Sequence, residues 1–228
     1  MKEPLPFYLV IDSLLQSGHF IVEEIVQTSK AEVIYISFET TNRPNYATEY
    51  IDYTEKATVS INDVLSHLDT VVANLGKSQT KRLVVFDSLN YIDHVAIGEL
   101  ISGVLRPDLV MISIFHSSLP SQKPKVLGYP GSLDLLQYMA SSIFRVFPIE
   151  VDEESESQCQ VGTFTPNATW NTKKYRLDLN NKRKSGRTLT YKYIIENGEV
   201  SPFVELAPQE TEDDAMLEGL TTFNLTIT

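Results

Sequence analysis

Two acidic residues of this chain directly follow short apolar runs and could do chemistry on a phosphate. Asp87 comes after LVVF (residues 83–86), and Glu39 comes after EVIYISF (residues 32–38). Such runs are typical of buried parallel strands, whose carboxyl ends form the ligand-binding edge of an open α/β sheet. Asp87 could hold a magnesium ion there, and Glu39 could polarise an attacking water. Capping of the loop after each strand is the alternative interpretation.

The residues that would hold the phosphates themselves are missing. A phosphate loop lies between a strand and a helix, and it needs glycines whose N–H groups wrap the phosphates and a lysine that neutralises them. The first predicted strand (residues 5–11) is followed by DSLLQSGH (residues 12–19), which contains only Gly18 and no lysine. Gly76-Lys77-Ser78 has neither the earlier glycine nor a preceding strand. We therefore expect a degenerate phosphate loop and no complete active site.

A basic cluster and a histidine are further candidates for phosphate contacts. The cluster is NKRKSGR (residues 181–187), with Lys182, Arg183, Lys184 and Arg187 between two predicted strands. In an acidic chain, these cations indicate an anionic partner, the phosphates of a nucleotide or of RNA; a solvated turn is the alternative. His116 follows another apolar run, where it could sense a phosphate or cap a loop. The four His and one Cys show no metal-ligand spacing, so we expect no metal site.

Alternating apolar runs and amphipathic segments predict an α/β fold with a mostly parallel central sheet, flanked by helices. Antiparallel strands follow, around a turn at Asn197-Gly198. The expected parallel strands are residues 5–11, 32–38, 83–86, 109–115 and 143–151; the helices are 14–26, 45–53, 61–75, 92–105 and 132–140; the antiparallel strands are 175–179, 188–195 and 200–206.

Length and composition fit one such domain. The chain has 228 residues, 42% of them hydrophobic, which is enough to bury a full core. Its 19 Lys and Arg against 30 Asp and Glu give a net charge of −11, which argues against a protein that coats nucleic acid. Cys159 has no partner for an internal disulfide, so we expect a reducing compartment. No signal peptide or membrane-spanning run is recognisable, so we expect no membrane contact.

The domain is expected to span residues 1–206. Residues 207–228 read as an acidic linker followed by the apolar stretch GLTTFNL (residues 219–225). We expect Leu220, Phe223 and Leu225 to dock either on this chain or on a neighbouring subunit.

Four motifs in order carry a resemblance to a known family. ISFETTNRPNY, VVFDSLNYI, NKRKSGR and GLTTFNL, which span most of the chain, resemble the fungal type of the Elongator subunit five family, and more broadly a RecA-like ATPase core of the KaiC type. In such ATPases one strand ends in the catalytic acid, at the place of Glu39, and another in the Walker B acid, at the place of Asp87. A basic Lys-x-Arg element, matched by residues 182–187, reaches the nucleotide of the neighbouring subunit.

The resemblance implies a RecA-like, non-catalytic subunit of a hexameric ring formed with Elongator subunits four and six. It implies the catalytic Elongator subunits and tRNA as further partners, a role in wobble-uridine modification, and a cytoplasmic and also nuclear location. We expect no cofactor of its own and no ATP hydrolysis by the isolated chain. The alternative is an ATPase half-site that offers its basic residues to ATP held at a subunit interface. Ser88 and Asn90 are further candidates for a subunit interface. Glu39 and Asp87 are candidates for vestigial catalytic acids.

Overall fold

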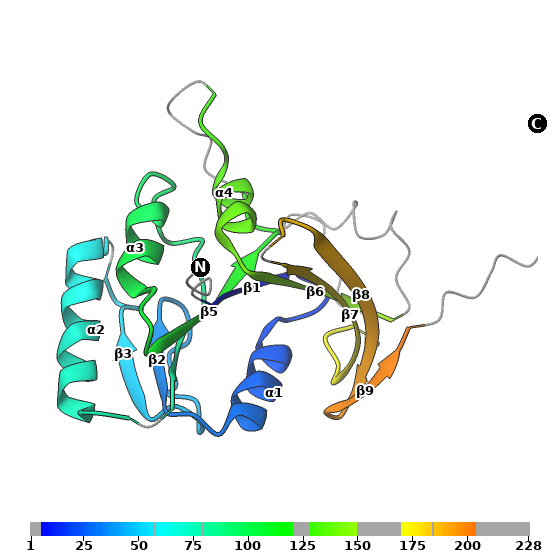
Figure 1. The fold of residues 1–228 in the computed structure, drawn as a ribbon, viewed down its shortest axis with the longest axis horizontal. Coiled ribbons are helices and arrows are strands. Elements are labelled where there is room, and N and C mark those ends of the chain that lie inside the picture. Colours follow the sequence, from blue (N-terminus) through cyan, green and yellow to red (C-terminus); the bar gives the residue numbers. More distant parts are fainter. Residues whose placement is uncertain are drawn as a thin grey trace, which may run out of the picture.

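The described residues form one nine-stranded sheet in the order β3-β2-β4-β5-β1-β6-β7-β8-β9 (Figure 1). In this computed structural model they are residues 6–56, 58–78, 80–120, 128–149, 170–183 and 185–203. The strands are β1 (Phe7–Asp12), β2 (Val33–Ser37), β3 (Glu49–Asp52), β4 (Arg82–Phe86), β5 (Leu109–His116), β6 (Ser142–Pro148), β7 (Lys174–Lys182), β8 (Thr188–Glu196) and β9 (Glu199–Pro202). The predicted α/β architecture is confirmed.

The strands β1 to β6 run parallel, so their carboxyl ends meet at one edge of the sheet. Every residue of β2 and β4 is buried, as expected of strands that are covered on both faces. In the middle of the sheet, Leu9 of β1 pairs with Ser113 of β5 on one side and with Ile143 of β6 on the other. The apolar runs at β2 and β4 therefore form strands that bury all of their side chains.

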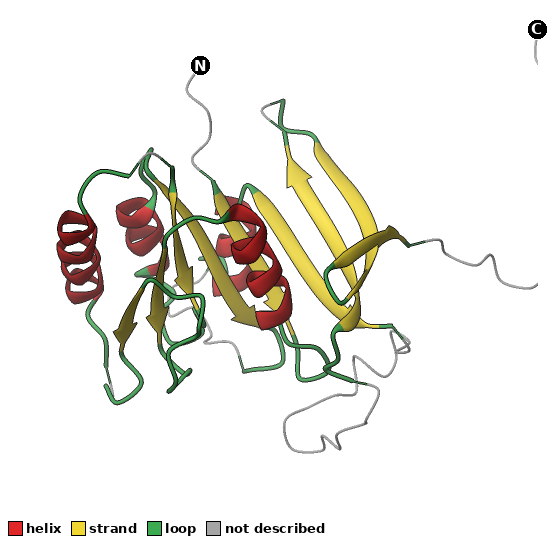
Figure 2. Cartoon of the chain, turned by 90° about the horizontal axis from the view of Figure 1, so that it is seen from below, coloured by secondary structure: helices red, strands yellow, loops and turns green. Residues whose placement is uncertain are grey.

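The strands β7, β8 and β9 continue the same sheet in antiparallel pairing and project beyond the helices (Figure 2). The turn between β8 and β9 uses Asn197 and Gly198, both with positive φ, as the Asn-Gly pair predicts. Ser142, the first residue of β6, pairs with Asn181 near the end of β7. The turn between β7 and β8 therefore lies at the amino edge of the parallel strands, opposite the edge where ligands of such sheets bind.

In the described part of the chain, one helix packs on one face of the sheet and three pack on the other (Figure 1). The helices are α1 (His19–Ser29), α2 (Ile61–Leu75), α3 (Ile97–Val104) and α4 (Ser132–Met139). Val22 of α1 belongs to one buried cluster, whereas Leu68 of α2, Leu100 of α3 and Leu136 of α4 belong to the other. None of the helices in the described part of the chain is long and apolar enough to cross a membrane.

The prediction of a helix over residues 45–53 is wrong, because Glu49–Asp52 within this segment pairs with β2 as the edge strand β3. The Thr48 N–H donates to the Val33 carbonyl at 2.8 Å. The Tyr50 ring stacks on that of Tyr35 with centroids 6.1 Å apart. Aromatic and β-branched residues favour a strand where a neighbour offers pairing and contact.

Two predicted helices begin later than expected. The helix predicted from residue 14 begins at His19, and the one predicted from residue 92 begins at Ile97. In the first case the preceding loop is held by side chains from distant parts of the chain, which take the N–H groups that a longer helix would use.

Candidate functional site

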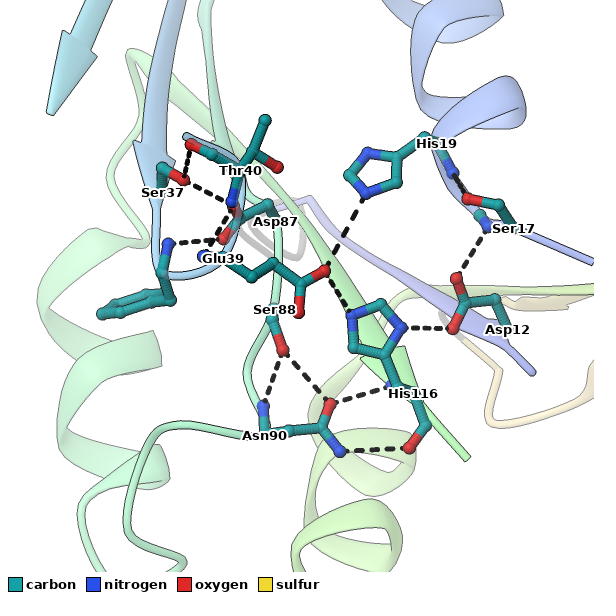
Figure 3. Close-up of polar contacts among 12 residues, drawn as sticks. Asp12, Ser17, His19, Ser37, Glu39, Thr40, Asp87, Ser88, Asn90 and His116 are labelled. Carbon is teal, nitrogen blue, oxygen red and sulfur yellow. Dashed lines mark hydrogen bonds and ion pairs between the residues drawn. The ribbon is translucent and has the colours of Figure 1, made fainter. Parts of the chain in front are cut away.

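Polar side chains from four neighbouring parallel strands meet at the carboxyl edge of the sheet (Figure 3). Asp12 ends β1, His116 ends β5, Glu39 lies two residues after β2, and Asp87 directly follows β4. This is the edge at which the sequence predicts a phosphate site. The structure brings all four residues together, so their hydrogen bonds show what each side chain is free to do.

Asp87 is fully buried, and its carboxylate accepts four hydrogen bonds from the end of β2. Its Oδ1 accepts the Phe38 N–H at 2.7 Å, and its Oδ2 accepts the Ser37 hydroxyl at 2.6 Å. The Glu39 and Thr40 N–H groups also donate to Oδ2, at 3.2 and 2.8 Å. A carboxylate with this many donors has little capacity left for a metal ion or a water. Asp87 caps the loop after β2 and fixes the position of Glu39.

His116 bridges the two other acids of the site. Its Nδ1 lies 2.6 Å from Oδ1 of Asp12, and its Nε2 lies 2.8 Å from Oε1 of Glu39. His19, the first residue of α1, adds a weaker contact, with its Nε2 4.0 Å from the same Glu39 oxygen. One oxygen of the Glu39 carboxylate, Oε1, is therefore engaged by imidazole nitrogens.

The bridge requires a protonated imidazole, since both ring nitrogens must donate to carboxylates. Burial by itself would lower the pKa of His116, but the hydrogen bonds and charges of Asp12 and Glu39 raise it to about 10. His116 is therefore a cation at neutral pH. It supplies the positive charge that this edge needs to hold two carboxylates side by side.

The loop between β1 and α1 has used its own backbone donors. A phosphate loop binds its ligand through free N–H groups at the start of the helix. Six of the seven N–H groups of residues 13–19 already have partners in this chain. In order, Ser13 donates to the Gln16 carbonyl, Leu14 to the Ser118 hydroxyl, Leu15 to the Ser13 hydroxyl, Ser17 to the Asn171 side chain, Gly18 to Asp12 and His19 to the Ser17 hydroxyl.

The Gly18 N–H binds an anionic side-chain oxygen of this chain where a phosphate loop would bind a phosphate. It donates to Oδ2 of Asp12 at 2.8 Å in a buried contact. An anionic oxygen on this N–H is what a bound phosphate would provide, and here the chain supplies it. A Cβ on Gly18 would lie 2.6 Å from Cγ1 of Val10, so glycine is needed for the close approach of the loop to β1.

The segment before β7 holds the loop from outside. The Asn171 N–H donates to the Leu15 carbonyl at 2.8 Å, and the Asn171 side-chain oxygen accepts the Ser17 N–H at 3.0 Å. Gln16 is fully buried beneath this segment and donates from Nε2 to the Thr172 carbonyl at 3.1 Å. Residues more than 150 positions apart thus close the loop together.

Ser88 and Asn90 order the neighbouring loop. Asn90 donates from Nδ2 to the His116 carbonyl at 3.0 Å and accepts the His116 N–H at 2.8 Å, so it extends the pairing of β5. Ser88 is fully buried within this chain, and its role at a subunit interface stays a prediction. Asn90 is half-buried, and its interface role stays a prediction.

The basic residues of the turn between β7 and β8 lie at the opposite edge of the sheet. Lys182 donates from Nζ to the Gln137 and Tyr138 carbonyls at 2.6 and 2.8 Å, so its charge is used on the end of α4. Arg183 and Arg187 are exposed. Four predicted site residues lie outside the described part of the chain: Lys184, Leu220, Phe223 and Leu225.

Asp12 is not among the predicted site residues, and His116 has two predicted roles, phosphate sensing and loop capping. The available signal was that each of them directly follows an apolar run, as Glu39 and Asp87 do. Within the residues that the structure describes, no group of three or more His, Cys, Asp or Glu side chains is arranged to hold a metal ion. The site is a network of internal hydrogen bonds.

Comparison with known proteins adds the family. The family model described as Elongator subunit Iki1 matches residues 1–228. Elongator complex protein 5 of Saccharomyces cerevisiae is 33% identical over 248 residues, which covers 99% of this chain and 79% of the yeast protein. Among solved structures, the RadB recombinase is similar with a TM-score of 0.52 at 13% identity, over 88% of this chain and 92% of that chain. This likeness confirms the predicted RecA-like fold, and the two sequence matches show that the chain belongs to the Elongator subunit Iki1 family.

Proposed function

We propose that this chain is a non-catalytic subunit of the Elongator complex, which assembles with subunits four and six into a hexameric ring. In this proposal the ring binds tRNA and supports the modification of wobble uridines by the catalytic subunits. One observation carries the non-catalytic part: the donors that would bind a phosphate are taken up inside the chain, with Asp12 on the Gly18 N–H. The vestigial Walker B acid, Asp87, has likewise become a cap with four donors.

Nucleotide binding by the isolated chain tests this part. Titration with MgATP, followed by calorimetry, should show no binding, because a triphosphate would have to break the Gly18 to Asp12 hydrogen bond without gaining a lysine. ATP hydrolysis by the purified chain, lost in an Asp87→Ala variant that remains folded, would contradict the proposal.

Assembly tests the other part. Co-expression with Elongator subunits four and six, followed by mass measurement of the purified complex, should give a hexamer with two copies of each chain. The same hexamer should retain tRNA in a filter-binding assay. If the chain stays a lone monomer in the presence of both partners, the ring assignment is wrong.

The position of the basic turn favours a second candidate, an ATPase half-site. Arg183 and Arg187 lie at the amino edge of the sheet, away from the loop at residues 13–19, so any nucleotide that they touch belongs to another subunit. Substitution of Lys182, Lys184 and Arg187 by Ala in the assembled ring separates the candidates. Loss of ATP hydrolysis with tRNA binding intact supports the half-site, whereas loss of tRNA binding supports the role in RNA binding.

A further inference from the structure

The most exposed large hydrophobic side chain in the described part of the chain lies beside the basic turn. Tyr138, in the last turn of α4, has 82% of its surface exposed. Large aromatic side chains are mostly buried in folded proteins, and a few exposed ones often mark a binding surface. The sequence gives no sign of this neighbourhood, because Tyr138 is 44 residues away from Lys182 along the chain.

Lys182 joins the turn to α4. Besides its two hydrogen bonds to α4 carbonyls, its Nζ lies 5.8 Å from the centre of the Tyr138 ring. Its backbone N–H donates to the Ser141 carbonyl at 2.9 Å, directly after the helix. Four contacts from one residue therefore hold the turn and the aromatic ring in a fixed relation. They also use the Lys182 charge, so the cations available to a ligand are those further along the turn.

Arg183 and Arg187 supply this charge. The Arg183 N–H donates to the Arg187 carbonyl at 2.8 Å, and the turn is closed by Gly186, whose φ of +79° suits glycine. Both side chains are exposed, and within the described residues no carboxylate forms an ion pair with either of them. Two guanidinium groups kept apart from acids, in a chain with a net charge of −11, favour an anionic ligand.

We propose that Tyr138, Arg183 and Arg187 form a contact site for a single-stranded segment of tRNA. An unpaired base stacks on the Tyr138 ring, and the flanking phosphates bind the two arginines. This inference rests on the proposed role in tRNA binding and assigns residues to it. A nucleotide triphosphate or an acidic protein would need the arginines alone, whereas the combination of an exposed ring with cations is typical of surfaces that bind single-stranded RNA.

The test uses the hexamer assembled with subunits four and six, with fluorescently labelled tRNA as the probe, at several salt concentrations. Tyr138→Ala should weaken binding about 5- to 100-fold at every salt concentration, since stacking does not depend on ion release. Tyr138→Phe, which keeps an aromatic ring for stacking, should bind tRNA as tightly as the wild type. The double variant R183A/R187A should weaken binding and also flatten the salt dependence, by a slope of about 1.4 for two phosphates on a single strand.

One matched control and one variant with the opposite expected effect are available. The double variant K77A/K81A removes the same charge from exposed residues before β4, four strand positions from β7, and should leave the salt slope unchanged. Asp134→Asn removes the one acid of α4, one turn before Tyr138, and should strengthen binding. Unlabelled oligouridylate should compete with tRNA for the wild-type hexamer better than double-stranded RNA of the same length.

Each contrary result has a distinct meaning. If the wild-type hexamer does not bind tRNA, the proposed function fails and this inference fails with it. If it binds tRNA and the Tyr138 and arginine variants bind equally well, only this inference is refuted. Variants that are folded by circular dichroism but no longer assemble would show a protein interface instead. Loss of ATP hydrolysis with tRNA affinity unchanged would show the half-site instead. If K77A/K81A weakens tRNA binding as much as R183A/R187A does, the effect of the arginines is one of overall charge and this inference is refuted.

Discussion

Substitution of Asp87 separates a structural acid from a catalytic one. Asp87→Ala leaves the Ser37 hydroxyl and three N–H groups, those of Phe38, Glu39 and Thr40, without their buried acceptor. A hydrogen bond to a charged group contributes about 1.5 to 3 kcal/mol, and an unsatisfied buried donor costs a similar amount. These contributions are not additive, so we expect a loss of about 3 to 5 kcal/mol in the free energy of unfolding.

Urea denaturation of the purified chain, followed by circular dichroism, measures this loss. With an m value of about 3 kcal/mol/M, the midpoint should fall by about 1 to 1.7 M. Asp87→Asn should lie between the wild type and Asp87→Ala. An amide nitrogen in place of Oδ1 faces only the Phe38 N–H, while the remaining oxygen keeps the three donors on Oδ2.

Asp69→Ala is the matched control. Asp69 is exposed and forms a single ion pair with Arg106, so its loss should cost at most about 1 kcal/mol. An acid kept for catalysis is usually held at some cost to stability, so its removal should leave the protein as stable or make it more stable. An Asp87→Ala midpoint at or above that of the wild type would refute the structural reading of this residue.

Two further predictions concern the same edge of the sheet. The pKa of His116, about 10 in the folded chain against an ordinary 6.5, means that its bridge contributes fully below about pH 6.5 and is lost as the pH rises through 10. The difference in free energy of unfolding between the wild type and His116→Gln should therefore shrink between pH 6 and pH 10, and a difference independent of pH would contradict the charged bridge. Gly18→Ala should cost about 1 to 3 kcal/mol because its Cβ would meet Val10, whereas Gly98→Ala, with open space around its Cβ, should not destabilise. Equal melting temperatures for these two variants would show that the loop is not packed as closely as described.

Much of the fold follows from local sequence. The runs at residues 32–38, 83–86 and 109–115 are short and predominantly apolar, as is typical of strands that are buried on both faces. The segment at residues 45–53 has no such unambiguous pattern, because tyrosines and isoleucine at this spacing suit a helix face as well as a strand. Its state was decided by the free edge of β2, which no local pattern reports.

The candidate site likewise has features that local sequence predicts and features that depend on tertiary structure. The sequence by itself determined that Glu39, Asp87 and His116 follow strands, and that the loop at residues 12–19 lacks a lysine and all but one glycine. A missing lysine shows only that a phosphate would be held weakly. It does not show what happens to the N–H groups that remain.

Only the tertiary structure decided that these groups are already occupied. The acceptors on the loop include Ser118 and Asn171, which are 104 and 154 residues away from their donors. Pairing across such distances depends on where the sheet places each strand end, so no spacing in the sequence encodes it. The same is true of Tyr138, which reaches the basic turn because β6 pairs with β7. Residue types set the chemistry that each strand end could offer, and the order of the strands set which groups meet and which stay free.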